Sequence, residues 1–436
     1  MNDYRRLFAN VTAVGGPVLL DEAYSALVGA ALVSLINRLG TGCLAEYTVA
    51  GLVQASLIGI FGSVGTGAAV MVARATGARD WFASRMVVSK TLAGSFGVGL
   101  ALALTGWVFS DRLLPEADVD SAELPAMARL FWLALPFLLS IQVGKSVLQG
   151  MGATGDAFRL SAFCSTIGLV LGNFFVFVWP GSGILAIAWA VCLSAAAGLV
   201  FCLLLIARHS NLRFSWRHVF VGEPGLVRSI CRISSPVIIE QCFLQLGFSL
   251  FVLILVDIGA EAFAANQVAQ QIEGVSLAVG ACLAATTLAL VGRALGEKSP
   301  DLANRYTRFI LSFSIASMTA IGLGYFYFAE ALVMPFTNDA STRSRAAACL
   351  SLAMLEQPTL AVTFVLGNAL RAAGDTKWPM LSTIIGIWLV RLPLCWILIG
   401  KLGFDIPVVW YITAADYFVR SVILAMRYRA TIRAVR

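Results

Sequence analysis

The sequence predicts an all-α integral membrane protein whose twelve transmembrane helices form two pseudo-symmetric six-helix bundles. Hydrophobic residues make up 59% of the 436-residue chain and charged residues 13%, against roughly 45–50% and about 25% in soluble proteins. Uncharged stretches recur along the chain, for example at 91–109, 160–178 and 310–328. Each is close to the roughly 20 residues that a helix needs to cross a bilayer. A repeat that relates the two halves supplies the third observation.

The repeat has a constant offset of 219 residues. Fixed-period similarity indicates a repeated architecture. Because six spans per half return the chain to the same side, the two repeats run parallel, as in one class of secondary transporters. The matching pairs are Pro17 and Pro236, Gly40 and Gly259, Ala50 and Ala269, Arg74 and Arg293, Gly77 and Gly296, and Gly155-Asp156 and Gly374-Asp375.

The apolar pattern places six spans in each half. We therefore expect an N-terminal lobe at 1–207, a linker at 208–228 and a C-terminal lobe at 229–436. The spans are expected to start near Val11, Ala45, Met86, Ala126, Ala157 and Gly183, and then near Ser229, Ala262, Arg305, Ala346, Thr376 and Phe404.

The net charge of +7 is distributed as membrane topology requires. Lys and Arg gather in segments that face the cytoplasm if both termini are cytoplasmic, whereas the acidic run 111–123 falls outside. The basic balance thus predicts orientation, and nucleic acid is not expected as a partner. The apolar run after Arg5 and Arg6 is interrupted by Asp21 and Glu22, so we interpret it as a retained first span and not as a cleaved signal peptide.

Composition also argues against an enzyme or a cofactor protein. The nine cysteines are scattered singly through apolar spans, which is typical of small buried hydrophobes and not of disulfides or metal ligands. His209 and His218 lie in the linker. There is no Walker motif for nucleotide binding and no paired Asp-rich motif. We expect no metal and no cofactor.

Gly-Asp turns follow spans four and ten, at 152–156 and 371–376. Each falls where one helix stops on glycine and the next begins, so Gly155, Asp156, Gly374 and Asp375 are expected to form a structural motif. An aspartate beside the start of the next helix suits an N-cap.

These turns and their surroundings resemble the multidrug and toxic compound extrusion (MATE) family, with the closest similarity to its bacterial DinF-like branch. The segments that carry the resemblance are 370–380, 389–393, 236–241, 264–267 and 271–273. It implies a twelve-helix transporter of the bacterial inner membrane, with a central cleft that opens alternately to each side. The implied activity is export of an organic, cationic or amphipathic compound in exchange for H⁺ or, alternatively, Na⁺. We expect a monomer whose partners are this substrate and membrane lipid.

The sequence departs from the family at two coupling positions. Many relatives carry an aspartate eight residues before the glycine that ends the first span, and Leu32 stands there. Sodium-coupled relatives carry a glutamate four residues after Glu240, and Leu244 stands there. Coupling residues of those relatives therefore do not transfer to this chain.

Inserting an ionisable side chain at bilayer depth costs about 2.5–3.5 kcal/mol of free energy on insertion scales. We therefore expect each such residue to have a function or a partner. Asp21 and Glu240 are matched by the repeat, and we predict that they exchange the coupling protons, with Glu22 and Glu273 in support. Lys145 is expected to be the internal partner of Asp21 or Glu22. Gln241 and Gln267 complete the predicted ion-coupling and substrate cleft.

The alternative for each of these carboxylates is a buried pair that fixes helix packing. Glu356 is interpreted as a helix-start residue or a functional acid, and Arg391 as the partner of a helix end or neighbour. Asp416 and Arg420, four residues apart on one helix, suit a structural pair. Two further functions stay open: a dedicated exporter of a secondary metabolite or lipid-linked compound and, least favoured, a membrane-embedded enzyme.

Overall fold

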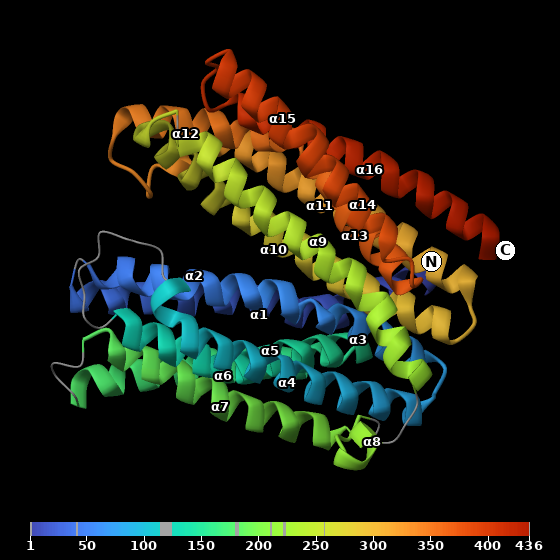
Figure 1. Cartoon of the computed structure of the whole chain (residues 1–436). Helices are drawn as coiled ribbons and strands as arrows, with labels where there is room; N and C mark the ends of the chain where they lie inside the picture. Colours follow the sequence, from blue (N-terminus) through green and yellow to red (C-terminus); the bar gives the residue numbers. More distant parts are fainter. Residues whose placement is uncertain are drawn as a thin grey trace. The chain divides into compact units, whose positions relative to one another are not determined.

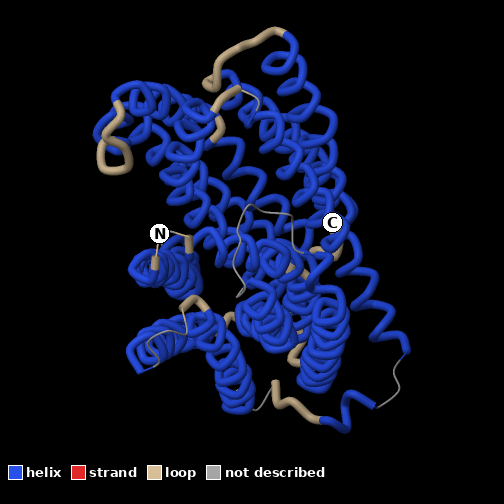
Figure 2. The backbone as a smooth tube through the Cα atoms, turned by 60° about the vertical axis from the view of Figure 1, so that its left-hand side comes forward, coloured by secondary structure: helices blue, strands red, loops and turns tan. Residues whose placement is uncertain are grey.

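The computed structural model describes residues 2–40, 42–113, 124–178, 183–209, 212–220, 224–256 and 258–435. Residues 114–123 of the acidic outer run and Glu223 of the linker lie outside this part of the chain. The described residues form helices, turns and loops without strands, as Figure 2 makes plain. The predicted all-α class is confirmed.

The first half contains eight helices, which Figure 1 labels in order. They are α1 (Asn2–Leu39), α2 (Cys43–Gly62), α3 (Val64–Gly77), α4 (Trp81–Leu113), α5 (Leu124–Met151), α6 (Thr154–Val178), α7 (Leu185–Arg208) and the short α8 (Trp216–Phe220).

The second half repeats the long helices and adds breaks. Its elements are α9 (Pro224–Val256), α10 (Ala260–Gly296), α11 (Pro300–Val333), α12 (Ala340–Leu352), η1 (Ala353–Leu355), α13 (Gln357–Ala372), α14 (Lys377–Ile384), η2 (Ile385–Arg391), α15 (Leu392–Cys395), η3 (Trp396–Lys401) and α16 (Val408–Val435).

Within the described residues, eleven helical segments are long and apolar enough to cross a membrane, and a bent pair supplies the twelfth. Helices α2 and α3 together make one span, Cys43–Gly77. The bent pair joins Ala340–Leu355 to Gln357–Ala372 at an angle of 52°. Glu356 sits at this break as the residue that precedes α13. The predicted number and order of spans agree with the structure.

The repeat is visible in the backbone. Arg79 and Lys298, which the 219-residue offset matches, have φ values of 56° and 55° and are the described non-glycine residues with positive φ. Each follows the end of a helix. The amide of the next residue, Asp80 or Ser299, donates to the carbonyl of Ala75 or Ala294, at 2.9 and 3.0 Å. These are matching helix-ending turns in which a left-handed residue satisfies free carbonyl groups.

Two packed units account for the chain, one comprising Met1–Gly15 with Ile239–Arg436 and the other Gly16–Ile238. The start of α1 therefore packs with the C-terminal unit. Phe8 lies against Phe313 with ring centroids 6.3 Å apart, and Asn10 Nδ2 donates to the Tyr306 hydroxyl at 2.7 Å. The two units are defined by packing, whereas the predicted division is defined by the sequence repeat. That division, into lobes at 1–207 and 229–436 with a linker at 208–228, stays a prediction.

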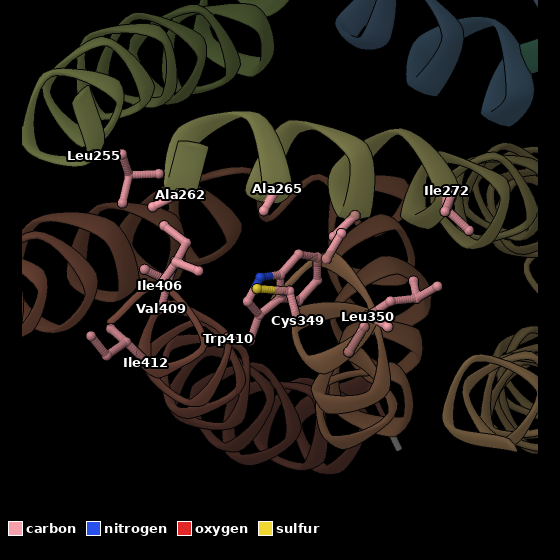
Figure 3. Close-up of a cluster of buried hydrophobic side chains, with 14 of the residues drawn as sticks. Leu255, Ala262, Ala265, Ile272, Cys349, Leu350, Ile406, Val409, Trp410 and Ile412 are labelled. Carbon is pink, nitrogen blue, oxygen red and sulfur yellow. The ribbon is translucent and has the colours of Figure 1, made fainter. Parts of the chain in front are cut away.

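A hydrophobic core of the C-terminal unit joins residues of α9, α10, α11, α12, the eleventh span and α16. Figure 3 shows Ala265 of α10 above Trp410 of α16 and Cys349 of α12, with the indole nitrogen beside the sulfur. The eleventh span, α14 to η3, passes alongside with two π-helical stretches around Pro393. Such wide turns are often found at functional sites. Here the first of them ends at Arg391.

Candidate ion-coupling site

Asp21 of α1 is buried in the N-terminal unit, where it faces α5 and α6. Its Oδ2 atom lies 2.6 Å from Lys145 Nζ and accepts a hydrogen bond from Ser161 Oγ at 3.3 Å. The expected pairing of Lys145 with Asp21 is therefore present. A carboxylate and an ammonium at this distance form an ion pair in which each compensates part of the desolvation of the other.

Leu32 lies further along α1 and lines a separate cavity of about 280 Å³ in the same unit. The cavity wall there is mostly apolar, with Leu138, Ile141 and Leu169 among the other lining residues. The position where relatives carry an aspartate is thus an apolar wall in this chain.

Glu240 of α9 occupies the repeat-equivalent place in the C-terminal unit. Arg371 Nη2, from the end of α13, donates to both carboxylate oxygens at 2.8 and 2.7 Å. Thr383 of α14 donates to Oε1 at 2.8 Å. Three hydrogen bonds from a cation and a hydroxyl therefore hold the Glu240 carboxyl group in place. Each repeat therefore pairs its matched acid with a cation, from α5 in one and α13 in the other.

A second charged cluster lies deeper in the C-terminal unit, around α16. Asp416 Oδ2 accepts from Arg391 Nε at 2.9 Å and from Arg420 Nη2 at 2.7 Å. The Arg391 guanidinium also lies over the rings of Phe251 and Tyr417, at 5.9 and 5.3 Å. The expected pairing of Asp416 with Arg420 is confirmed, and Arg391 has the neighbouring-helix partner that one interpretation predicted.

Gly386 in the π-helical stretch η2 makes this cluster possible. A Cβ atom at this position would collide with the side chains of Asp416 and Arg420. Glycine lets the backbone of η2 approach the charged pair on α16 directly, which brings Arg391 of the same stretch within reach of Asp416.

Glu273 of α10 and Glu356 at the α12–α13 break meet beside this cluster, with 8% and 0% of their surfaces exposed. Their carboxyl groups lie beside each other, and Arg391 is near both. Two carboxylates accept but do not donate hydrogen bonds, so the contact is a hydrogen bond only if one of them is protonated. In the doubly charged form both Glu356 oxygens have no donor.

A cavity of about 270 Å³ opens onto Glu273. Its polar wall includes Asn266, whose amide nitrogen and oxygen are buried without partners, and Arg391, whose Nη2 is likewise unpartnered. The residues that line the cavity are Phe248, Phe251, Asn266, Gln270, Glu273, Leu277, Arg391, Val409, Trp410, Thr413 and Tyr417.

The charges in this cluster do not balance unless it holds a proton. Its acids are Glu273, Glu356 and Asp416, and its bases are Arg391 and Arg420. One proton shared by the two glutamates makes the cluster neutral, and loss of that proton leaves one net negative charge in a buried site. Such a charge costs several kcal/mol unless a cation compensates it.

The repeat does not extend to this cluster. At the 219-residue offset, Glu273 is matched by Gln54, and four apolar residues match the others. They are Phe137 for Glu356, Gly172 for Arg391, Ala197 for Asp416 and Phe201 for Arg420. Gln54 donates to the carbonyl of Phe131 at 2.6 Å and carries no charge. The second charged cluster is therefore specific to the C-terminal unit.

The structure brings together only part of the predicted site. Glu22 and Gln241 are half-buried beside Asp21 and Glu240 in sequence, and Gln267 is exposed on α10. The roles predicted for these residues, and for Asp21 and Glu240, stay predictions. Sequence reasoning missed Arg371, because it falls in the Gly-Asp turn, where a basic residue suits a cytoplasmic helix end.

The Gly-Asp turns bind basic side chains and do not cap helices as expected. Asp375 precedes α14, which has no side-chain cap, and its Oδ2 lies 2.6 Å from Arg427 Nε of α16. Asp156 contacts Arg159 and His209, each at 2.7 Å. The turns thus attach the end of one span to the last span of the same repeat.

Twelve candidate spans, a backbone repeat and buried ionisable clusters beside a cavity define a class of protein, the polytopic membrane transporters with repeated bundles. Across the described ranges, no group of three or more His, Cys, Asp or Glu is placed to hold a metal ion.

Comparison with known proteins gives the family. A family model described as MatE matches residues 17–174 and 236–397, so the chain belongs to the MatE family. It is a transporter and not an enzyme. The resemblance to MATE proteins is thereby confirmed, and the finer assignment to the DinF-like branch stays a prediction.

Individual proteins are similar to this chain over most of its length. "Uncharacterized transporter YisQ" of Bacillus subtilis is 22% identical over 95% of this chain and 93% of its own length. "Probable multidrug resistance protein NorM" of Thermotoga maritima is 28% identical over 81% and 77%. A solved outward-facing multidrug resistance MATE transporter superposes with a TM-score of 0.89, at 18% identity over 98% and 96% of the two chains. This structural likeness shows the shared fold.

Proposed function

We propose that this protein is a proton-coupled antiporter that exports organic cations or amphipathic compounds, and that Glu273 and Glu356 share the coupling proton. The observation that carries the proposal is the contact between these two buried carboxyl groups without a dedicated cation. Arg391, the nearest base, is already engaged by Asp416 at 2.9 Å. A proton is then the simplest cation that neutralises the excess negative charge of the pair.

Coupling follows from competition for one negative charge. When the glutamate pair holds the proton, the cluster is neutral and has little attraction for a cation. When the proton leaves, the negative charge draws a cationic substrate toward Glu273 at the cavity wall, while Phe248, Phe251 and Tyr417 contact its apolar part. A site that holds either ligand, but not both, exchanges them as the transporter alternates between its two open states.

Two features support H⁺ over Na⁺ as the coupling ion. The guanidinium of Arg391 lies near both glutamates and would repel a metal cation held between them. Leu244 also stands where the sodium-coupled relatives of the resemblance carry a glutamate.

Asp21 and Glu240 take a positioning role in this proposal. Each is held by a cation, Lys145 at 2.6 Å and Arg371 at 2.7 Å, so binding a proton there would leave a cation unpaired in the bilayer. The prediction from sequence, in which these two acids exchange the protons, is tested by the same experiment.

The test is transport in proteoliposomes under an imposed pH gradient or an imposed Na⁺ gradient. Glu273→Gln and Glu356→Gln should each abolish transport driven by the pH gradient, and the Na⁺ gradient should drive none in any variant. Glu330→Gln, which neutralises an exposed acid of α11, is the matched control and should transport normally. Normal transport by both site variants, with loss in Asp21→Asn and Glu240→Gln, would transfer the coupling role to the matched acids.

The second candidate, a dedicated exporter of a secondary metabolite, uses the same site and differs in substrate range. A biosynthetic gene cluster next to the gene would support it. Transport of many unrelated cations by the reconstituted protein would exclude it. For either candidate we propose a monomer in the bacterial cytoplasmic membrane with both termini on the cytoplasmic side.

A further inference from the structure

The face at the start of α11 carries basic and aromatic side chains that the proposed function does not use. Arg305, Arg308, Phe309, Ser312 and Phe313 recur three and four residues apart, so they share one side of the helix. We call this the α11 basic face. With Tyr4 and Leu7 of α1 it lines a cavity of about 660 Å³, which lies within the C-terminal unit.

Two aromatic contacts fix the wall that α1 contributes. Tyr4 lies against Phe309 with centroids 6.5 Å apart, and Phe8 lies against Phe313 at 6.3 Å. Tyr4 nevertheless keeps 70% of its surface exposed, Phe8 49% and Phe313 40%. The cavity thus has an apolar floor that the protein itself leaves uncovered.

The chemistry of this face changes with depth. The arginines fall in the first turns of α11, which begins at Pro300, and Ser312 and Phe313 lie further in. Arg305 and Phe313 are about 12 Å apart along the axis, at 1.5 Å per residue. That length exceeds the roughly 5–8 Å of one headgroup layer and reaches the hydrocarbon. A molecule seated here would meet cations at one end and aromatic rings at the other.

The matching face of the first repeat, on α4, is covered by the protein itself. The matching positions on α4 are Met86 and Ser89, which are fully buried in the N-terminal unit, whereas Arg305 and Arg308 are exposed. The linker covers the α4 face: the amide of Ser215 donates to Ser89 Oγ at 3.1 Å.

Two more contacts complete that cover. Lys90 Nζ donates to the carbonyl of Val219 at 3.3 Å, and Phe82 packs edge-to-face on His218 at 5.7 Å. One repeat therefore covers this face with its own chain, while the other leaves it open and basic.

We infer that the α11 basic face binds an acidic phospholipid of the cytoplasmic leaflet. The phosphate lies at Arg308 and Arg305, and an acyl chain covers Phe309, Phe313 and Leu7. Arg305 already takes part in an interaction within the protein, and Asp301 lies four residues before it, so Arg308 contributes most of the attraction. Basic pockets at the cytoplasmic ends of spans suit anionic headgroups, and the basic segments of this chain predict that this end is cytoplasmic.

The experiment counts lipids bound to the purified full-length protein by native mass spectrometry, with phosphatidylglycerol or phosphatidylcholine added at equal concentration. The wild type should retain one more phosphatidylglycerol than the double variant Arg305→Gln/Arg308→Gln. The apparent affinity for that lipid should fall at least about five-fold, since one basic residue near an anionic headgroup contributes about a factor of five and Arg308 supplies most of the attraction.

The matched control is Arg228→Gln/Arg232→Gln, which removes two exposed arginines, one helical turn apart on α9, from the same predicted side. It should keep the additional lipid. Arg308→Lys should keep most of the binding, because the charge remains.

Three results would overturn the inference. They are equal phosphatidylglycerol binding by wild type and the Arg305/Arg308 variant, equal retention of phosphatidylcholine by the wild type, and complete displacement of the lipid by millimolar inorganic phosphate. The last would identify a site for free anions. The readout is binding and not transport, so it is independent of the proposed coupling site.

Discussion

Glu356, at the break between α12 and α13, makes carboxyl-to-carboxyl contact with Glu273 of α10 and has no exposed surface. The two residues come from spans eight and ten, and their repeat mates are Gln54 and Phe137. The contact joins two acids in a place where the chain has only two bases to balance three carboxylates. Its protonation state therefore sets the net charge of the C-terminal cluster.

This contact predicts proton release when a cationic substrate binds. In weakly buffered detergent solution, the wild type should release about one proton per bound cation, because the substrate replaces the shared proton. Glu356→Gln should release none, since it cannot lose a proton. The measurement is a pH-indicator titration, with Glu330→Gln as the control. Undiminished release from Glu356→Gln would contradict the assignment.

The Glu240–Arg371 pair predicts an asymmetric mutational effect. Arg371→Met should lower the free energy of unfolding by about 3–5 kcal/mol, because it leaves a buried carboxylate with only Thr383 as a donor. Adding Glu240→Gln should restore most of that loss by removing the unpaired charge. Thermal unfolding of the purified single and double variants measures both. If the double variant is no more stable than Arg371→Met, the two residues are not energetically paired.

Gly386 predicts a packing defect. Gly386→Ala should lower the free energy of unfolding by about 1–3 kcal/mol, because the added methyl group collides with Asp416 and Arg420 in a filled site. Gly324→Ala is the matched control: Gly324 is also helical, but a Cβ atom there meets nothing within 4 Å. The control should be neutral or slightly stabilising. Equal effects at the two positions would show that η2 does not depend on its close approach to α16.

The distribution of basic residues predicts the orientation of the protein. A single cysteine placed at Arg213 in a cysteine-free background should react with an impermeant thiol reagent only after the cells are opened. A cysteine at Thr337, in the connection between α11 and α12, should react in intact cells. Labelling at position 213 from outside intact cells would reverse the assignment of both termini.

The sequence by itself determined the class, the number of spans, the repeat and the family. These follow from composition, apolar runs and a constant offset, which are local or periodic properties of the chain. Bilayer insertion requires about 20 apolar residues wherever a helix crosses, so spans can be counted without tertiary information. The offset even matches Arg79 with Lys298, which adopt the same rare backbone conformation.

The tertiary structure decided which charges meet. Asp21 and Lys145 are 124 residues apart in the chain, Glu240 and Arg371 are 131 apart, and Glu273 and Glu356 are 83 apart. Helix rotation, the break before α13 and the wide turns of η2 set these pairings, and no local pattern encodes them. From the sequence alone, burial is expected to cost the same for each of these acids. The fold provides bases for Asp21 and Glu240 and places Glu273 and Glu356 against each other. Charge interactions depend on distance in space, so the candidate for proton exchange emerged only from the folded arrangement.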